Sequence, residues 1–160
     1  MQLAAALSET GLRFSEPVRT LLDQKGRAVW SITPEETVYR AVQAMSERQV
    51  GALIVLSGGL LAGIVSERDY ARKVILKGRN SQFTLVRDIM TSPVLYVTPE
   101  QSLEECMRLI TTRRVRHLPV VERDAVIGVL SIGDIVNWIV ASQQQTIQQL
   151  HSYINGSYPG

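Results

Sequence analysis

The chain has 160 residues, 45% of them hydrophobic and 20% charged, with a formal net charge of +2, which is typical of a globular domain and too mild to indicate a nucleic-acid surface. No apolar run approaches the roughly 18 residues that cross a bilayer, and the N-terminal stretch has neither the basic segment nor the apolar length of an export signal. Because the single cysteine, Cys106, excludes an internal disulfide, we predict a protein of the reducing cytoplasm with no membrane association.

An internal repeat organises the sequence. The segment 29–35 recurs as 94–100, an offset of 65 (98 − 33, from Thr33 to Thr98), and the register holds without a gap to about residue 75. The residues of the first copy that are identical at this offset are Val29, Thr33, Pro34, Glu35, Arg48, Val50, Leu53, Val55, Gly63, Ser66 and Asp69. We therefore predict two copies of one unit, divided as a lead-in (1–17), copy one (18–80), copy two (81–141) and a C-terminal helical extension (142–160).

Both copies predict the same elements in the same order. Thr33 and Thr98 look like helix N-caps, because each is followed by proline and then glutamate, as in the first turn of a capped helix. The helices after them carry apolar residues at helical spacing, and Cys106 is expected there as a buried, inert thiol. Short apolar runs follow, and they predict one hairpin per copy, at 52–56 with 60–65 and at 118–121 with 125–130.

A second helix closes each copy. Ser66 and Ser131 each stand three residues before an aspartate, the spacing of an N-cap with an acceptor at the third helical position. The residues expected on the buried faces are Tyr70, Ala71, Val74 and Ile75 in copy one, and Ile135, Val136, Ile139 and Val140 in copy two. The second of these helices is expected to continue to a stop at Gly156, with Trp138 either in a subunit contact or packed against the extension.

Each unit is thus predicted as β-α-β-β-α, and the fold class as α+β. Similar lead-ins, Val18–Leu22 and Val86–Met90, precede the two copies. Since neither copy can bury both faces of its sheet alone, we expect the two sheets to pack together around one shared core.

Several motifs resemble those of a known family. Gly63–Asp69 and Gly128–Asp134 are similar to the Gly-h-h-Ser/Thr-x-x-Asp/Asn signature of CBS (cystathionine-β-synthase) domains, where h is apolar, and Val115–Val121 resembles the strand motif before it. The resemblance covers about residues 18–140 and implies a stand-alone tandem pair of the Bateman type, with pseudo-two-fold symmetry. It also implies a regulatory module that binds an adenosine ligand (AMP, ADP, ATP, NAD or S-adenosylmethionine) between its repeats, forms a homodimer, and signals through a conformational change to an unidentified effector protein. Bound AMP, ATP or NAD is then a regulatory ligand rather than a catalytic cofactor.

The two signature aspartates, Asp69 and Asp134, have two interpretations. As helix caps they are fully explained, since a carboxylate at this position satisfies a backbone donor. The resemblance implies instead that at least one of them accepts hydrogen bonds from the 2′ and 3′ hydroxyls of a ribose. Ser66 and Ser131, together with the helix amides, would then receive phosphate.

A basic run precedes the second hairpin. Arg114, Arg116 and His117 have no charged counterparts in copy one, so the fold of the repeat does not require them. They form either an exposed basic edge that discourages aggregation or a phosphate clamp, and the resemblance assigns the clamp to Arg116 and His117. Arg68 is a further candidate for a phosphate contact.

The remaining candidate positions are small or apolar. Gly51 and Ala52, the counterparts of Arg116 and His117, leave room for a base or a ribose, and main-chain atoms near Leu53 and Leu118 are expected to read adenine. Pro119, opposite Ile54 in the repeat, removes a strand donor. The resemblance adds Thr33 and Thr98 to the ligand set. Because the copies differ at these positions, we expect the two clefts to bind nucleotide unequally.

Two other functions stay open at this point. An enzyme with an unrecognised site would use His117 and Asp134 as acid and base, but the sequence has no Ser/His/Asp set, Walker loop or metal-ligand spacing, so we assign no catalytic or metal residue. A module without a ligand would bind a protein or, through Arg113–His117, a nucleic acid. That basic run lacks interleaved aromatic residues and is a weak footprint for nucleic acid.

Overall fold

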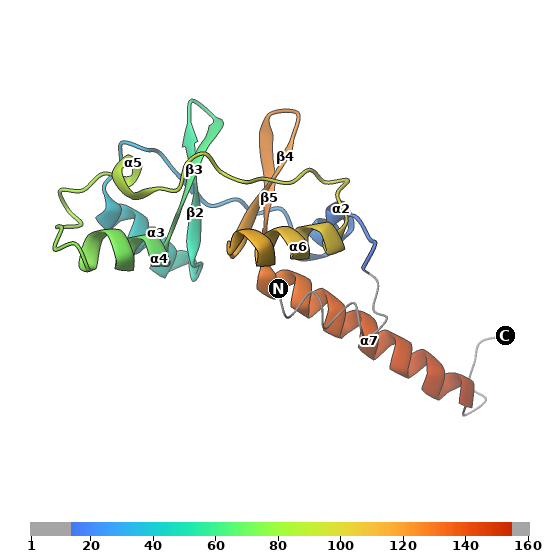
Figure 1. Cartoon of the computed structure of the whole chain (residues 1–160). Coiled ribbons are helices and arrows are strands. Elements are labelled where there is room, and N and C mark those ends of the chain that lie inside the picture. Colours follow the sequence, from blue (N-terminus) through green and yellow to red (C-terminus); the bar gives the residue numbers. More distant parts are fainter. Residues whose placement is uncertain (1–13, 155–160) are drawn as a thin grey trace.

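The computed structural model describes residues 14–154, which form two similar halves that meet at a seam (Figure 1). The first half contains β1 (Ser31–Ile32), α3 (Val38–Arg48), β2 (Ala52–Ser57), β3 (Leu60–Ser66), α4 (Glu67–Tyr70) and a π-helical turn (Ala71–Ile75). The second half contains α6 (Leu103–Arg113), β4 (His117–Glu122), β5 (Ala125–Ser131) and α7 (Ile132–Ile154). Two short helices, α2 (Val18–Lys25) and α5 (Val86–Ile89), lie in the segments that lead into the halves. The predicted α+β class is confirmed, and none of the described helices is long and apolar enough to cross a membrane.

Each half is built on a β-hairpin. β2 pairs antiparallel with β3 and parallel with β1, while β4 pairs antiparallel with β5 and gains one parallel bridge in the place of β1. The two-residue turns have positive φ angles, 59° and 82° at Gly58 and Gly59 and 51° and 64° at Arg123 and Asp124. Such turns match the twist of the flanking strands. β3 and β5 contact each other across the seam, so the two sheets pack together as predicted.

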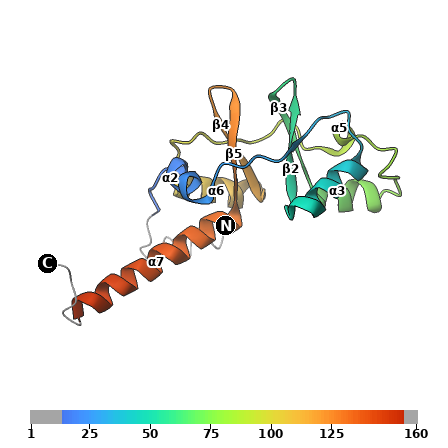
Figure 2. The ribbon, with the colours of Figure 1, turned by 180° about the vertical axis from the view of Figure 1, so that it is seen from behind.

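The lead-in helices are exchanged between the halves. α2 precedes the first half in the chain but buries Val18, Leu21 and Leu22 in the core of the second half. α5 precedes the second half but buries Val86 and Ile89 in the core of the first. Figures 1 and 2 both show α2 beside α6 and α5 on the side of α3.

This exchange corrects the prediction of a single shared core. The buried apolar side chains of the described residues form two clusters, one in each half. Each half can close its own core because it receives a helix from the segment that leads into the other. The domain boundary at 80/81 stays a prediction.

The first helix of each half begins later than predicted. Thr33 and Thr98 open turns, in which the carbonyl of each accepts from the amide three residues on, at 3.3 and 3.2 Å. The N-caps are Thr37 and Ser102, whose hydroxyls accept from the backbone amides three residues further along. The predicted capping roles of Thr33 and Thr98 are wrong. Each is followed four residues later by a second residue that can cap a helix, Thr37 or Ser102, and this second residue is the N-cap. The sequence Thr-Pro-Glu is compatible with a β-turn as well as with the start of a helix.

The second helices begin as predicted, but part of the face expected to be buried is exposed. Val74, Ile135 and Ile139 are buried. The exposed residues are Ala71, Ile75, Val136 and Val140, which correspond in pairs at the repeat offset of 65. The prediction that they face the core of their own chain is wrong, because the helices present only a narrow stripe to the hairpins.

Three predictions concern α6 and α7. Cys106 is buried as predicted, and burial raises the pKa of its thiol to about 12, which disfavours the reactive thiolate at pH 7. Trp138 is half-buried against the core of the second half rather than placed on an outer face. α7 continues past the repeat to Ile154 and projects from the body of the molecule (Figure 1), while the predicted stop at Gly156 lies outside the described residues, as do residues 1–13.

Candidate functional site

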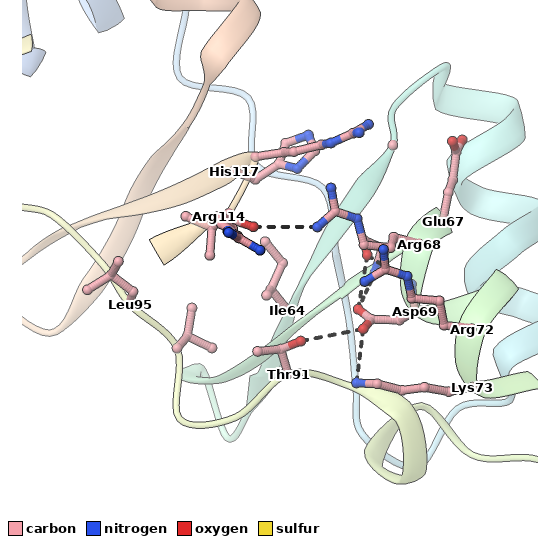
Figure 3. Close-up of a pocket in the computed structure, with 15 residues that line it drawn as sticks. Ile64, Glu67, Arg68, Asp69, Arg72, Lys73, Thr91, Leu95, Arg114 and His117 are labelled. Atoms are coloured by element: carbon pink, nitrogen blue, oxygen red, sulfur yellow. Dashed lines mark hydrogen bonds and ion pairs between the residues drawn. The ribbon is translucent and has the colours of Figure 1, made fainter. Parts of the chain in front are cut away.

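A cleft of about 380 Å³ lies at the seam between the halves (Figure 3). The first half contributes the end of β3, α4 and the π-helical turn, and the second half contributes the chain that enters β4. The cleft is lined by Gly51, Ile64, Ser66, Glu67, Arg68, Asp69, Arg72, Lys73, Thr91, Val94, Leu95, Arg114, Val115, Arg116 and His117. Its size falls within the range of small-molecule sites, which run from about 300 to 1,000 Å³.

Asp69 stands on one wall of this cleft and is only 8% exposed. Its Oδ2 accepts from the amide and the hydroxyl of Ser66, both at 3.0 Å, and its own amide donates to that hydroxyl at 3.1 Å. Its Oδ1 lies 3.0 Å from Nζ of Lys73 and accepts from the hydroxyl of Thr91 at 3.5 Å. The capping interpretation is confirmed, and it uses one carboxylate oxygen while the other faces groups that line the cleft (Figure 3).

Four arginines line the cleft, and we call Arg68, Arg72, Arg114 and Arg116 the arginine cluster. The first two come from α4 and the π-helical turn, and the last two come from the chain before β4. Within residues 14–154, no member of the cluster has a carboxylate within 4.0 Å. Nη1 of Arg68 donates to the carbonyl of Arg114 at 3.4 Å, so this guanidinium reaches across the seam (Figure 3).

The π-helical turn helps to bring basic side chains to the cleft. It follows α4 directly, and both Arg72 and Lys73 belong to it and line the cleft. π-helical turns are rare and frequently occur at functional sites, because they change which side chains face a neighbouring surface. In the second half the same positions hold Asn137 and Trp138, on an uninterrupted α-helix.

His117 lies at the start of β4, where it pairs with Ser131 across the hairpin. Its ring borders Gly51: a Cβ at that glycine would lie 3.8 Å from Cε1 of His117. Burial lowers the pKa of His117, and the nearby charges of Lys25 and Arg116 lower it further, while Asp134 and Glu67 oppose the shift. The imidazole is therefore neutral at pH 7.

This shift predicts a pH dependence of stability. Because the pKa of His117 is lower in the folded than in the unfolded state, its stabilising contribution is complete above about pH 6.5 and is lost as the pH falls through the folded pKa. Relative to His117→Gln, the wild-type protein should lose unfolding free energy between pH 7.5 and 5.5, measured by urea denaturation. A difference that stays constant over this range would contradict the assignment.

The structure brings part of the predicted ligand set together. The predicted residues that line the cleft are Gly51, Ser66, Arg68, Asp69, Arg116 and His117. Ala52 pairs with Ser66 beside it, and Leu53, Leu118 and Pro119 are buried in the hairpins. Thr33 lines a separate depression beside α3, and Thr98 lies in its exposed turn. Ser131 and Asp134 do not line this cleft, although Ser131 pairs with His117 across the second hairpin.

Four further residues line the cleft without having been predicted as ligand residues, namely Arg72, Lys73, Thr91 and Arg114. A signal for the first two was present, since they follow Asp69 by three and four residues, the spacing of one helical face. No such signal existed for Thr91, which approaches because α5 packs on the first half.

The second half engages its aspartate differently. Oδ2 of Asp134 accepts from the amide of Ser131 at 2.8 Å and from Nζ of Lys25 at 2.6 Å. Lys25 is the last residue of α2 and also donates to the carbonyl of Val129 at 2.6 Å. Both bonds use the same oxygen of this carboxylate, and within residues 14–154 no hydrogen bond joins His117 to Asp134, the pair that an enzyme would use as acid and base. No group of three or more His, Cys, Asp and Glu suited to a metal ion occurs in residues 14–154.

The seam is therefore asymmetric in charge. At the offset of 65, the counterparts of the arginine cluster are Gly133, Asn137, Gln49 and Gly51, and none of them is charged. The difference gives a physical basis for the expectation that the two clefts bind ligand unequally.

Comparison with known proteins follows the same division of the chain. A protein-family model described as "CBS domain" matches residues 26–75 and 86–141. A mitochondrial CBS domain-containing protein of Arabidopsis thaliana is 40% identical over 164 residues, an alignment that spans 96% of this chain and 79% of the relative. The CBS domain-containing protein YhcV of Bacillus subtilis is 31% identical, over 67% of this chain and 76% of its own length.

Solved structures show the same fold. A CBS-domain protein of Burkholderia ambifaria, described as a signal-transduction protein, superposes with a TM-score of 0.76 at 47% identity, covering 79% of this chain and 96% of that one. A hexameric CBS-CP12 protein from bloom-forming cyanobacteria superposes with a TM-score of 0.68 at 30% identity, covering 75% and 70%.

Proposed function

Because the chain belongs to the CBS-domain family, we propose that it is a regulatory module that binds an adenosine nucleotide, of the AMP, ATP or NAD kind, in the seam cleft and catalyses no reaction. Proteins of this family are regulatory and signal-transduction modules. The observation that carries the proposal is the cleft itself, which has a carboxylate on one wall and the arginine cluster around it.

Each part of such a ligand has a chemical match in the cleft. Ribose hydroxyls donate to Oδ1 of Asp69, in exchange for its present donors Lys73 and Thr91. Phosphate oxygens accept from guanidinium groups in paired, charge-assisted bonds. The apolar side chains that line the cleft offer a surface for adenine, namely Ile64, Val94, Leu95 and Val115.

The proposed mechanism is a population shift. The cleft is lined by both halves, so a ligand that contacts both favours one relative orientation of the halves. It shifts the equilibrium only by the difference of its affinity between the two orientations. An effector protein that binds one orientation more tightly would then bind the module to a different extent when the ligand is present.

Calorimetric titration of the whole chain with AMP, ATP and NAD tests the proposal. We expect at least one of them to bind with a stoichiometry of one per chain, because Asp69 and the arginine cluster line the same cleft and the counterparts of the cluster in the repeat are uncharged. A turnover assay on the same compounds is expected to detect no product. Absence of binding by all three nucleotides, or turnover of any of them, would overturn the proposal.

We also place a homodimer in this proposal. Ala71, Ile75, Val136 and Val140 lie exposed at matching positions of the second helices, and Ile75 and Val140 are 56% and 47% exposed. Covering this apolar surface with a second copy would remove it from water. Sedimentation equilibrium should give twice the mass of the chain, and a monomer at micromolar concentration would contradict the homodimer.

The cytoplasmic location stays a prediction, since one relative is named as mitochondrial.

A further inference from the structure

The seam cleft carries an excess of positive charge. Its lining includes five cations, the arginine cluster and Lys73, and two carboxylates, Glu67 and Asp69, which gives a net charge of +3 with neutral His117. Lys73 already pairs with Asp69 at 3.0 Å, and Glu67 is exposed. Within residues 14–154 no carboxylate therefore pairs with the arginine cluster.

The fold itself does not need this charge. The counterparts of all four arginines in the repeat are uncharged, and the other end of the seam is built without them. Like charges that gather at one cleft repel each other and raise the free energy of the empty protein. A polyanion bound among them removes that repulsion.

A single phosphate is too small to match the arginine cluster. One guanidinium donates paired hydrogen bonds to two phosphate oxygens. A terminal phosphate has few free oxygens and a charge of only about −1.5 to −2. The cluster, moreover, is divided between the halves, with two arginines on each. A chain of phosphates offers oxygens along its length and can contact both halves at once.

We infer, on the basis of the nucleotide site proposed above, that this cleft selects ligands that end in a chain of two or more phosphates, in contrast to NAD, whose two phosphates are esterified at both ends. A nucleoside di- or triphosphate is favoured over a monophosphate and over uncharged or cationic adenosine compounds. It is also favoured over NAD, because the positive nicotinamide of NAD offsets part of its negative charge. The arginine cluster determines this preference, while Asp69 contributes equally to every adenosine ligand.

Competition titrations with a matched pair of variants test the inference. Dissociation constants of ATP, GTP, ADP, AMP and adenosine are measured without added divalent cations, together with inorganic tripolyphosphate as a competitor that lacks the nucleoside. Arg114→Gln removes one member of the cluster and installs the residue that the first half carries at Gln49, where φ is 55° against 54° at Arg114, so the backbone is preserved. Arg113→Gln removes an exposed neighbour that does not line the cleft and serves as the control.

We expect ATP to bind about tenfold or more tightly than AMP, tripolyphosphate to displace it, and Arg114→Gln to weaken ATP about tenfold but adenosine hardly at all. The Arg113→Gln protein should match the wild type. AMP binding as tightly as ATP, or equal effects of the two substitutions, would overturn the inference while leaving the nucleotide site intact. Tripolyphosphate displacing ATP, with GTP binding as tightly as ATP, would support the inference and overturn the adenosine preference of the proposed function.

Discussion

Asp69→Asn is expected to weaken ATP binding about tenfold or more, because a ribose loses the charged acceptor on the wall of the cleft. Asparagine keeps the size of the side chain and one oxygen, which the capping box with Ser66 requires. The fold should therefore persist, and thermal melts of the variant check that it does. Calorimetric titration with ATP gives the change in the dissociation constant.

Asp134→Asn is the matched control for this experiment. It alters the equivalent capping aspartate of the second half, which does not line the cleft that holds the arginine cluster. ATP affinity and stoichiometry should stay close to those of the wild type. Equal losses in the two variants would show that both aspartates contact nucleotide, and unchanged affinity in both would leave the aspartates as helix caps alone.

Leu22→Ala is expected to lower the free energy of unfolding by about 2.7–5 kcal/mol. Leu22 is fully buried and carries α2 into the core of the second half. It packs so closely over β5 that a Cβ at Gly128 would lie 2.9 Å from its Cδ2. The substitution leaves a cavity beneath α2. Among the described helices that precede β4 in the chain, α2 and α6 pack in the core of the second half, and α2 is the one that comes from before the first half.

Urea denaturation of Leu22→Ala measures this loss, with Leu60→Ala as its control. Leu60 is 59% exposed at the first hairpin, so its truncation should change stability by no more than about 0.5 kcal/mol. A small change in both proteins would mean that α2 is not part of the second core. The exchange of helices also brings Lys25, the last residue of α2, to the signature aspartate of the second half, Asp134.

The features that the sequence predicted correctly are local or repeated. The hairpins follow from short apolar runs separated by turn residues, and the capping boxes of the second helices follow from Ser66 and Ser131 with aspartate three residues on. The repeat strengthened each assignment, because the same pattern of residues occurs in both copies. Arg116 and His117 were predicted as cleft residues because they differ from their counterparts in copy one, which are small and uncharged.

The features that the sequence did not predict depend on contacts between distant segments. The lead-in helices resemble each other, but nothing in their residues indicates that each packs on the other half, and the divided core follows from that exchange. Lys25 reaches Asp134, and Thr91 reaches Asp69, for the same reason. The exposure of Ile75 and Val140 was missed because an apolar stripe on a helix does not reveal whether its own chain or a partner covers it.

A crystal structure of the protein with ATP would show directly whether the cleft holds the nucleotide. We expect one nucleotide per chain, with its ribose hydroxyls within hydrogen-bond distance of Asp69 and its phosphates among the arginine cluster, and with Lys25 still bound to Asp134. A nucleotide seated at Asp134 instead, or an empty seam cleft at saturating ATP, would contradict it.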